Sequence, residues 1–493
     1  RLSHPLKKLL SQTAIYGLST IVVRMLNFLL APLHTRVFLD QADYGIISEM
    51  YAYVTFLNVI FMYGMETAFF RFASGKDPHD HRKVFGTAQG SLILTTVLFT
   101  GVLLLMSSRI ATFLQYPGHG EYVVYFALII GFDSLVNIPF ARLRLEQRPW
   151  RYFVIKLGSI GINVFFNFFF LLPAILQKPD MFGFIGFHFK QEQAVGYVFI
   201  ANLIASAATF AIFLPGMRRL SVDKLLWKKL MLYGMPLVLI GLAGMINETF
   251  DRVLLKYLLP GTLEENLAQI GIYSAVYKIS IFMTLAVQGF RMGAEPFFFH
   301  QSSSDNAPKV YALVMKYFVI VCCIIFLGVG MFPDVFRIII GENYHEGLGI
   351  VPVLLFANLL LGVYYNQSVW YKLTDKTLYA TIIPVAGAVL SIVANIILIP
   401  IAGYEGAAWS RLLCYASMVI LSHMIGQKYY HVPYNVRKIL AYFAISIVLC
   451  LAGLWLHDGL GEGSTSFALR LGLIALFTGF AWWLDGRSLL RRS

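Results

Sequence analysis

Apolar runs long enough to cross a lipid bilayer recur along the whole chain. A helix that spans the hydrocarbon core needs ~20 mainly apolar residues, and about fourteen such runs occur, bounded by charged residues, proline or glycine. A membrane barrel would need strands of alternating polarity, whereas these runs are continuously apolar. The sequence therefore predicts an all-α integral membrane protein. The expected spans are 12–38, 43–70, 84–106, 122–145, 152–176, 194–215, 230–257, 270–296, 310–332, 348–369, 377–400, 404–427, 438–457 and 466–485.

The composition excludes a soluble protein. Only 13% of the 493 residues are charged and 58% are hydrophobic, whereas soluble chains carry about 25% charged residues. In a soluble protein, the net charge of +13 would suggest nucleic-acid binding. Its distribution over the loops gives a different explanation, so no nucleic-acid partner is expected.

The basic residues of the loops alternate along the chain. One set of loops and ends holds 25 Lys and Arg residues, and the opposite set holds five and collects acids such as Glu264 and Glu265. Short loops rich in Lys and Arg stay on the cytoplasmic side of a membrane. This pattern predicts that both termini are cytoplasmic. The first run contains Arg24 and is too long for a cleaved signal peptide, so we interpret it as a span.

Several kinds of chemistry find no support in the sequence. The chain has no phosphate-binding G-x-x-x-x-G-K-[ST] loop, H-E-x-x-H motif or G-x-S-x-G elbow. All four cysteines fall inside expected spans, so neither a disulfide framework nor a zinc cluster is indicated. We expect no catalytic residues, no metal site and no cofactor. The alternatives are a membrane glycosyltransferase or glycan polymerase, which generally needs larger outer loops, and a scaffold that transports nothing.

An internal repeat relates spans one to six and seven to twelve. Tyr16-Gly17 is matched by Tyr233-Gly234, and Tyr51 is matched by Tyr277 at an offset of 226 residues. A repeat with an even number of spans keeps its orientation, so the pseudo-two-fold axis lies along the membrane normal. The repeat predicts two six-helix lobes, 1–220 and 221–430, that face each other across a cleft, and two further spans within 431–493.

Four stretches carry a resemblance to a known family. They are Asn395 to Ala408 (NIILIPIAGYEGAA), Asp251 to Leu255 (DRVLL), Gly271 to Ala275 (GIYSA) and Ala294 to Phe297 (AEPF). With the span pattern, they resemble the polysaccharide transporter (oligosaccharide flippase) family of the multidrug/oligosaccharidyl-lipid/polysaccharide (MOP) exporter superfamily, which also includes lipid II flippases. The resemblance covers essentially the whole chain.

The resemblance implies a flippase of the bacterial inner membrane. Such a protein moves an undecaprenyl-diphosphate-linked oligosaccharide, a repeat unit of O-antigen, capsule or exopolysaccharide, from the cytoplasmic to the outer leaflet by alternating access. Its partners would be the lipid bilayer, the lipid-linked glycan and glycan polymerases or glycosyltransferases, and we expect a monomer. The alternatives are a lipid II flippase and a multidrug or cation antiporter of the same superfamily.

Charged residues inside the spans point to a substrate path. Nine basic and six acidic residues lie in the expected spans, and a charge at the bilayer centre costs at least ~2.5 kcal/mol unless it faces protein or water. The basic surplus favours an anionic substrate, and Arg presents a fixed fork of donors that matches phosphate oxygens. We predict that Arg24, Arg252, Lys278, Arg291 and Arg36 bind the diphosphate. The residues predicted to contact sugar hydroxyls are Tyr51, Asn247, Tyr273, Tyr277, Gln288 and Asn366.

Three of the five basic candidates also have a structural interpretation. Arg252 follows Glu248 by four residues and Arg291 precedes Glu295 by four, so each arginine can be neutralised on its own helix. Arg36 and Lys316 lie near span ends, where long side chains extend to the interface. Arg24 has no acid at either helical spacing and is the strongest candidate.

Acidic residues in the spans predict coupling to a proton or sodium gradient or to the membrane potential, because a carboxylate in a cavity can exchange a proton or hold a cation. The candidates are Asp133, Asp251 and Glu248, and the alternative is that each pairs with an arginine. Glu66 is expected to pair with Arg71 or to face the interface. The last two spans are interpreted either as a groove for the isoprenoid tail or as a pair that packs on a lobe.

Overall fold

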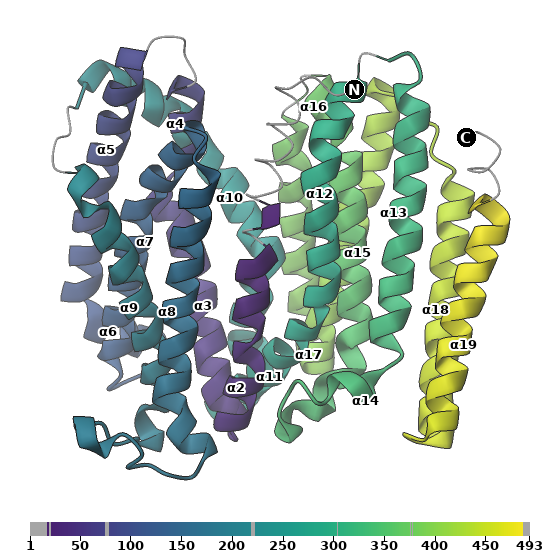
Figure 1. Ribbon diagram of the computed structural model, residues 1–493, viewed down its shortest axis with the longest axis horizontal. Helices are drawn as coiled ribbons and strands as arrows, with labels where there is room; N and C mark the ends of the chain where they lie inside the picture. The colour runs from purple at the N-terminus through teal and green to yellow at the C-terminus, as the bar shows by residue number, and fades with distance from the viewer. Residues whose placement is uncertain are drawn as a thin grey trace. The chain divides into compact units, whose positions relative to one another are not determined.

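The computed structural model describes residues 17–18, 21–73, 78–217, 222–302, 304–374, 376 and 378–486. Within these ranges the secondary structure is helical and no strand occurs, which confirms the predicted all-α class (Figure 1). Twelve of the described helices are long and apolar enough to cross a membrane. The chain is therefore a multi-pass membrane protein.

The expected count of fourteen spans differs from twelve for two reasons. Helix α17 (Tyr379–Tyr429) has 51 residues and covers two expected spans. A straight helix of that length would measure roughly 75 Å, yet the hydroxyls of Tyr379 and Tyr429 lie 3.0 Å apart. Helix α17 is therefore a hairpin of two spans, which turns at Gly403. The first expected span lies partly outside the described residues, so the count of fourteen stays a prediction.

The chain divides into two compact units, Arg1–Val253 and Leu254–Ser493. The division falls within one helix, α10 (Lys224–Leu258). The lobe boundaries expected at residues 220 and 430 stay predictions.

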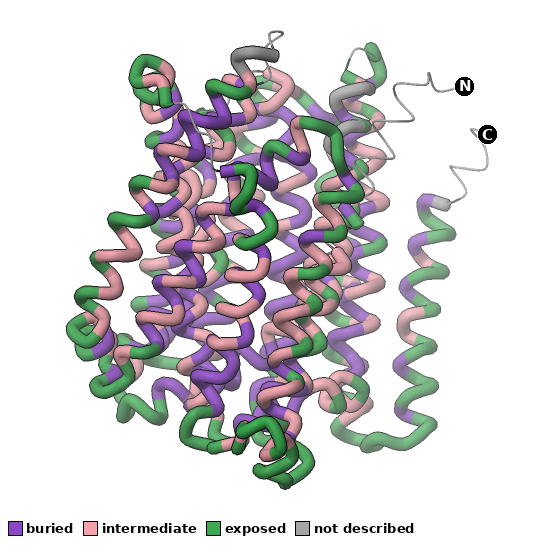
Figure 2. The backbone as a smooth tube through the Cα atoms, turned by 60° about the vertical axis from the view of Figure 1, so that its left-hand side comes forward, coloured by how far each residue is buried: buried purple, intermediate pink, exposed green. Residues whose placement is uncertain are grey.

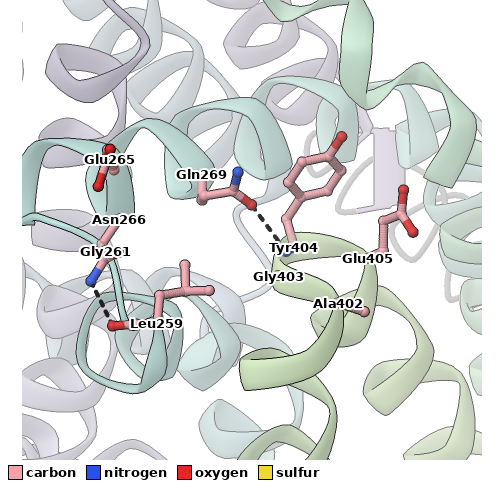
Figure 3. Close-up of a pocket in the computed structure, with 9 residues that line it drawn as sticks. All are labelled: Leu259, Gly261, Glu265, Asn266, Gln269, Ala402, Gly403, Tyr404 and Glu405. Atoms are coloured by element: carbon pink, nitrogen blue, oxygen red, sulfur yellow. Dashed lines mark hydrogen bonds between the residues drawn. The ribbon is translucent and has the colours of Figure 1, made fainter.

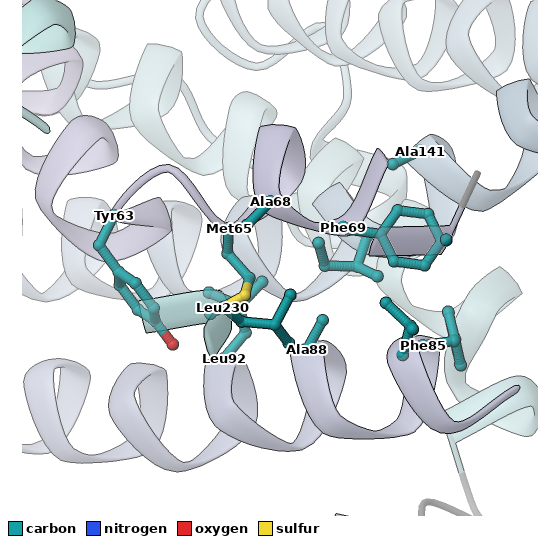
Figure 4. Close-up of a cluster of buried hydrophobic side chains, with 12 residues drawn as sticks. Tyr63, Met65, Ala68, Phe69, Phe85, Ala88, Leu92, Ala141 and Leu230 are labelled. Atoms are coloured by element: carbon teal, nitrogen blue, oxygen red, sulfur yellow. The ribbon is translucent and has the colours of Figure 1, made fainter. Parts of the chain in front are cut away.

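Unit 1 is built around α7 (Gly120–Leu145), which packs against most of the other helices of the unit. An apolar cluster joins α4, α5, α7 and α10 around Met65, Phe69 and Leu230 (Figure 4). Gly64 and Gly234 make a close backbone approach there, because a Cβ on Gly64 would lie 2.4 Å from the carbonyl oxygen of Gly234. The other elements of the unit are α2 (Leu30–Val37), α3 (Gln41–Met62), α4 (Met65–Ala73), α5 (Pro78–Leu105), α6 (Ser107–Phe113), α8 (Pro149–Ile175), η1 (Gly183–Ile185), η2 (Gln191–Gln193), α9 (Ala194–Phe213) and η3 (Leu214–Met217).

Unit 2 has a corresponding central helix, α15 (Val351–Gln367), which packs against α17, α13 and α12. Helices α7 and α15 hold the fourth spans of the two predicted repeats, so the two units share one packing plan. The other elements are α11 (Leu263–Tyr277), η4 (Lys278–Ser280), α12 (Ile281–Gln301), α13 (Ala307–Gly330), α14 (Pro333–Phe336), η5 (Glu342–Ile350), α16 (Val369–Leu373), α18 (Val436–Leu460), α19 (Ser464–Ala481) and the π-helical η6 (Trp482–Gly486).

Local sequence signals set where several helices begin. The carboxylate of Asp40 accepts a hydrogen bond from the backbone N–H of Ala42 at the start of α3, and Asp223 accepts from the N–H groups of Leu225 and Leu226 at the start of α10. These N–H groups would otherwise lack a partner in the first helical turn. They hold the pKa of Asp223 below its ordinary value, because they stabilise the ionised carboxylate.

One side-chain contact is repeated in the two units. The hydroxyl of Tyr51 on α3 accepts a hydrogen bond from Asn202 of α9 at 3.0 Å. Tyr277 on α11, its match at the offset of 226, accepts from Arg411 of α17 at 3.1 Å. In both units the second span of the repeat is thus joined to the sixth. The donor of the hydrogen bond is a neutral side-chain amide in unit 1 and a charged guanidinium group in unit 2.

The C-terminal helices α18 and α19 pack against each other and against α13 (Figure 1). Exposed residues run along most of α19 (Figure 2), and its buried residues lie on one face. Gly453 of α18 packs tightly against Met331, since a Cβ there would lie 2.3 Å from the sulfur, while Gly472 and Gly479 have nothing within 4 Å.

Ionic contacts fasten this helix pair to α13 at both ends. The buried guanidinium of Arg470 donates two hydrogen bonds to the carboxylate of Asp334 at 2.8 and 2.9 Å and one to the carbonyl oxygen of Met331 at 2.7 Å. At the other end, the carboxylate of Asp485 accepts hydrogen bonds from Lys316 and Lys438. The pair therefore belongs to the body of unit 2.

Replacing Arg470 tests the first of these contacts. Arg470→Met leaves the carboxylate of Asp334 without its charged partner, and removing one partner of a buried ion pair costs about 3 kcal/mol or more in the free energy of unfolding. Denaturant unfolding of the purified full-length protein in detergent measures this loss. Arg337→Met is the matched control, because the Arg337–Glu462 pair is exposed and such pairs contribute at most about 1 kcal/mol. Equal losses in the two variants would contradict the assignment.

The same pair predicts a pH dependence. Hydrogen bonding from Arg470 holds the pKa of Asp334 below its ordinary value. A lowered carboxyl pKa stabilises the fold above the unfolded-state pKa of ~3.9, and this contribution is lost as pH falls through the folded-state value. The stability difference between the wild type and Arg470→Met should therefore be largest near pH 7 and shrink below about pH 4.

Candidate functional site

Two predicted diphosphate ligands of unit 1 lie near the start of the described chain. Arg24 is half-buried in the helical segment 21–28. Among the residues that the structure describes, none makes a hydrogen bond or ion pair with its guanidinium. Arg36 is exposed at the end of α2 and donates a hydrogen bond to the carbonyl oxygen of Pro32 at 3.0 Å. No donor of Arg24 is therefore taken up by a residue within the described ranges, whereas the placement of Arg36 fits the interfacial alternative.

Helix α10 carries four predicted site residues within two turns. Asn247, Asp251 and Arg252 are buried, and Glu248 is exposed. The guanidinium of Arg252 contacts the carboxylate of Asp251 and the carbonyl oxygen of Glu248, each at 3.3 Å. The positive charge of Arg252 is therefore partly neutralised by the adjacent carboxylate of Asp251. A guanidinium remains chemically suited to donate hydrogen bonds to phosphate oxygens.

Asp133 lies in a polar cluster inside unit 1. Its carboxylate accepts a hydrogen bond from Ser206 of α9, and the ammonium group of Lys156 on α8 is close enough to interact with it. Asn202 lies one turn before Ser206 on the same face of α9 and donates to the hydroxyl of Tyr51. The structure thus brings two predicted residues, Asp133 and Tyr51, into one cluster.

Glu66 corrects one expectation. Its carboxylate accepts hydrogen bonds from Arg144 and from Asn137, the latter at 2.9 Å, both on α7. Arg71, its expected partner, instead stacks on the ring of Tyr233, with its guanidinium carbon 4.3 Å from the ring centroid. The reason is that α4 packs against α7, which places a basic residue of another helix beside Glu66.

In unit 2, Arg411 organises two of the predicted sugar-contacting tyrosines. Its buried guanidinium donates hydrogen bonds to the hydroxyls of Tyr273 at 3.2 Å and Tyr277 at 3.1 Å, and lies 4.7 Å from the ring centroid of Tyr277. Tyr273 is fully buried and Tyr277 is half-buried. Lys278, the next residue along the chain, is also half-buried. Arg411 is one of the nine basic residues in the expected spans, but its sequence context did not predict a role in the site, because its partners lie on another helix.

A second group in unit 2 surrounds Tyr365. The guanidinium carbon of Arg291 lies 4.6 Å from the Tyr365 ring centroid, and Gln288 precedes Arg291 by one helical turn. The neighbouring Asn366 is 2% exposed, and within the part of the chain that the structure describes neither polar atom of its side chain has a hydrogen-bond partner. Buried polar atoms are nearly always paired, so this amide is suited to bind water or a ligand group. The side chain of Glu295, the alternative partner of Arg291, lies outside the described residues.

A polar pocket of about 370 Å³ lies at the turn of the α17 hairpin (Figure 3). The amide oxygen of Gln269 accepts a hydrogen bond from the backbone N–H of Tyr404. This contact requires glycine at position 403, because φ there is +56° and a Cβ would lie 2.8 Å from that oxygen. The carboxylates of Glu265 and Glu405 also line the pocket, so it favours ligands that donate hydrogen bonds. From the sequence Glu265 is expected in an acidic loop, and no motif indicates a pocket there.

The comparisons with known proteins agree on a family and a fold. A model of the polysaccharide biosynthesis protein family matches residues 9–299. Among curated protein sequences, none matches the chain.

Solved structures of the same fold cover almost the whole chain. An inward closed conformation of the lipid II flippase MurJ has a TM-score of 0.67 at 13% identity, over 97% of this chain and 100% of that one. A multidrug resistance MATE family transporter of the MOP superfamily, in its inward-facing conformation, has a TM-score of 0.60 at 15% identity, over 86% and 99%. Its outward-facing counterpart has a TM-score of 0.57 at 14% identity, over 90% and 100%.

The TM-scores show a shared fold at low sequence identity, and the family match covers more than half of the chain. Both agree with the resemblance that the sequence motifs carry, which is thereby confirmed. The chain belongs to the polysaccharide biosynthesis protein family and has the fold of the MOP-superfamily transporters.

Proposed function

We propose that this protein is a flippase that moves an undecaprenyl-diphosphate-linked oligosaccharide from the cytoplasmic to the outer leaflet by alternating access. It would act in the bacterial inner membrane, with both termini cytoplasmic, as the loop charges predict. The glycan would be a repeat unit of O-antigen, capsule or exopolysaccharide.

The observation that carries the proposal is the family match over residues 9–299. All five predicted diphosphate ligands fall within that stretch: Arg24, Arg36, Arg252, Lys278 and Arg291. A family of polysaccharide biosynthesis proteins with basic residues at membrane depth suits a glycan carried on a lipid phosphate. Guanidinium groups are suited to phosphate because their fork of donors stays charged.

Lipid II transport is the second candidate function. It is favoured by the fold shared with the lipid II flippase MurJ over 97% of this chain. Both cargoes present a diphosphate on an isoprenoid, so the same basic residues would serve either. A multidrug or cation antiporter, the function class of the MATE structures, fits the basic surplus in the spans less well.

Substitution of the two strongest candidate ligands tests the proposal. In proteoliposomes loaded with a fluorescent undecaprenyl-diphosphate-linked glycan, Arg24→Ala and Arg252→Ala should each slow transfer about tenfold or more, because a hydrogen bond to a charged group contributes ~1.5–3 kcal/mol. Arg24→Lys should retain part of the activity, since it keeps the charge but loses the fork.

The matched control is Arg109→Ala, which removes an exposed arginine of α6 and should leave transfer unchanged. Unfolding of each variant in detergent separates loss of transport from loss of fold. If both alanine variants at positions 24 and 252 flipped the lipid at the wild-type rate, the site assignment would be wrong even for a functional flippase.

We further propose that Asp133 couples transport to a proton gradient. Support comes from its interactions with Ser206 and Lys156, since a half-buried carboxylate beside an ammonium group can exchange a proton when that pairing changes. Asp251 and Glu248 remain the other coupling candidates, and sodium or the membrane potential remain the other driving forces.

Asp133→Asn should therefore abolish the stimulation of transfer by an imposed pH gradient, because the amide cannot titrate. Transfer without a gradient should fall much less. The measurement compares initial rates in proteoliposomes with and without the gradient. Glu121→Gln, which removes an exposed carboxylate from the start of α7, is the control. Gradient stimulation that survives in Asp133→Asn would exclude Asp133 as the coupling residue.

A further inference from the structure

The central helix of unit 1 contains a proline in its interior. Pro139 is buried within α7, and a proline has no backbone N–H. The carbonyl oxygen of Leu135, four residues earlier, therefore lacks the hydrogen bond that an α-helix would give it. In a membrane-spanning helix such a carbonyl must find another donor, because the hydrocarbon core offers no water to take its place.

The donor comes from α5. The side-chain amide of Gln89 donates a hydrogen bond from Nε2 to the carbonyl oxygen of Leu135 at 2.9 Å. Gln89 is fully buried, and its Nε2 also lies 3.5 Å from the sulfur of Met217 in η3. Its amide oxygen accepts no hydrogen bond from any residue that the structure describes. The polar contacts of this side chain are therefore made by Nε2, and the contact with Leu135 replaces the bond that Pro139 removes.

The internal repeat supplies a comparison within the same molecule. The expected third and fourth spans of unit 2 begin 226 residues after those of unit 1, so Met315 corresponds to Gln89. By the same offset, Tyr365 corresponds to Pro139. Tyr365 has a backbone N–H, and Met315 is a buried apolar residue of α13, which packs against α15 as α5 packs against α7. At this position the amide thus occurs in the unit whose central helix carries the proline, and the other unit has an apolar side chain.

The junction at Pro139 joins two parts of α7 with different roles. The part before it carries Asp133, the proposed coupling carboxylate, two residues before Leu135. The part after it carries Arg144, which pairs with Glu66. Proline already weakens or bends a helix at this point, so a carbonyl without a donor would loosen the junction further. The position of Asp133 therefore depends on the contact that α5 makes here.

We infer that Gln89 is a positioning residue: it takes the place of the N–H that Pro139 lacks, and so holds the segment of α7 that carries Asp133. The effect on transport rests on the proposed coupling role of Asp133. The contact itself and the order that it gives to α7 do not depend on that proposal, so separate measurements test the two parts.

A double-mutant cycle on the full-length protein in detergent tests the contact. Gln89→Met gives unit 1 the residue that unit 2 carries at the matching position, and it should raise the equilibrium constant of unfolding about tenfold, because a buried carbonyl loses its donor. Pro139→Ala restores the missing N–H. In the Pro139→Ala background, the change at Gln89 should therefore alter the constant by less than about twofold. If Gln89→Met does not fold, the double variant should recover folded protein.

The matched control is Gln427→Met. Gln427 also donates from Nε2 to a backbone carbonyl oxygen, that of Val432 at 2.8 Å, but no proline of α7 is involved. Its loss of stability should be the same with and without Pro139→Ala.

Hydrogen exchange and transport locate the effect. In Gln89→Met, peptides that cover residues 130–142 should exchange faster than in the wild type, because local opening of α7 becomes easier. Gln427→Met should leave these peptides at the wild-type rate. In proteoliposomes, the stimulation of transfer by an imposed pH gradient should be largely lost in Gln89→Met. The same change should cause no further loss in the Pro139→Ala background.

The possible outcomes separate the two parts of the inference. An equal rise of the unfolding constant in both backgrounds, or α7 exchange no faster than in the control, would overturn it. Faster exchange in α7 with unchanged gradient stimulation would show that Gln89 stabilises the helix without positioning Asp133. A wild type that flips the lipid without responding to the gradient would instead contradict the coupling role of Asp133, while the cycle and the exchange rates would still decide the role of Gln89 in α7.

Discussion

A charged side chain in the hydrocarbon core needs either a partner or water, and this requirement shapes both units. Ionised groups in the spans meet partners from other helices: Glu66 of α4 meets Arg144 of α7, and Asp485 meets Lys316 of α13. Removing one member of such a pair lowers the free energy of unfolding by more than the intact pair contributes to it. The pairs therefore act mainly by specifying which helices are neighbours, while packing of apolar side chains supplies the stability.

The sequence was sufficient to predict the structural features that depend on local composition. The apolar runs predicted the spans, because each helix must satisfy its own backbone groups in lipid. The separation of 377–400 from 404–427 anticipated the hairpin of α17, since Pro400 and Gly403 interrupt one long apolar run. The repeat was visible for a similar reason. Tyr51 and Tyr277 occupy matching positions, and in the structure each accepts a hydrogen bond from the sixth span of its repeat.

The partners of the charges could not be read from the sequence. Sequence alone detects only pairs that are close along the chain, so it suggested the nearby Arg71 for Glu66 and gave no partner for Arg470. The actual partner of Arg470, Asp334, lies 136 residues earlier in a short helix between spans. The unpaired amide of Asn366 was equally invisible, because burial without a hydrogen bond depends on the packing of α15 and not on residue type. Of the candidate site, the sequence could supply residues but not the groups into which they assemble.

The attachment of the C-terminal helices bears on how unit 2 can move. Arg470 binds α19 to the segment after α13, and Asp485 binds the other end of α19 to α13 itself. With one ionic contact at each end, α18 and α19 cannot pivot about a single point, so they must move with α13 as one body.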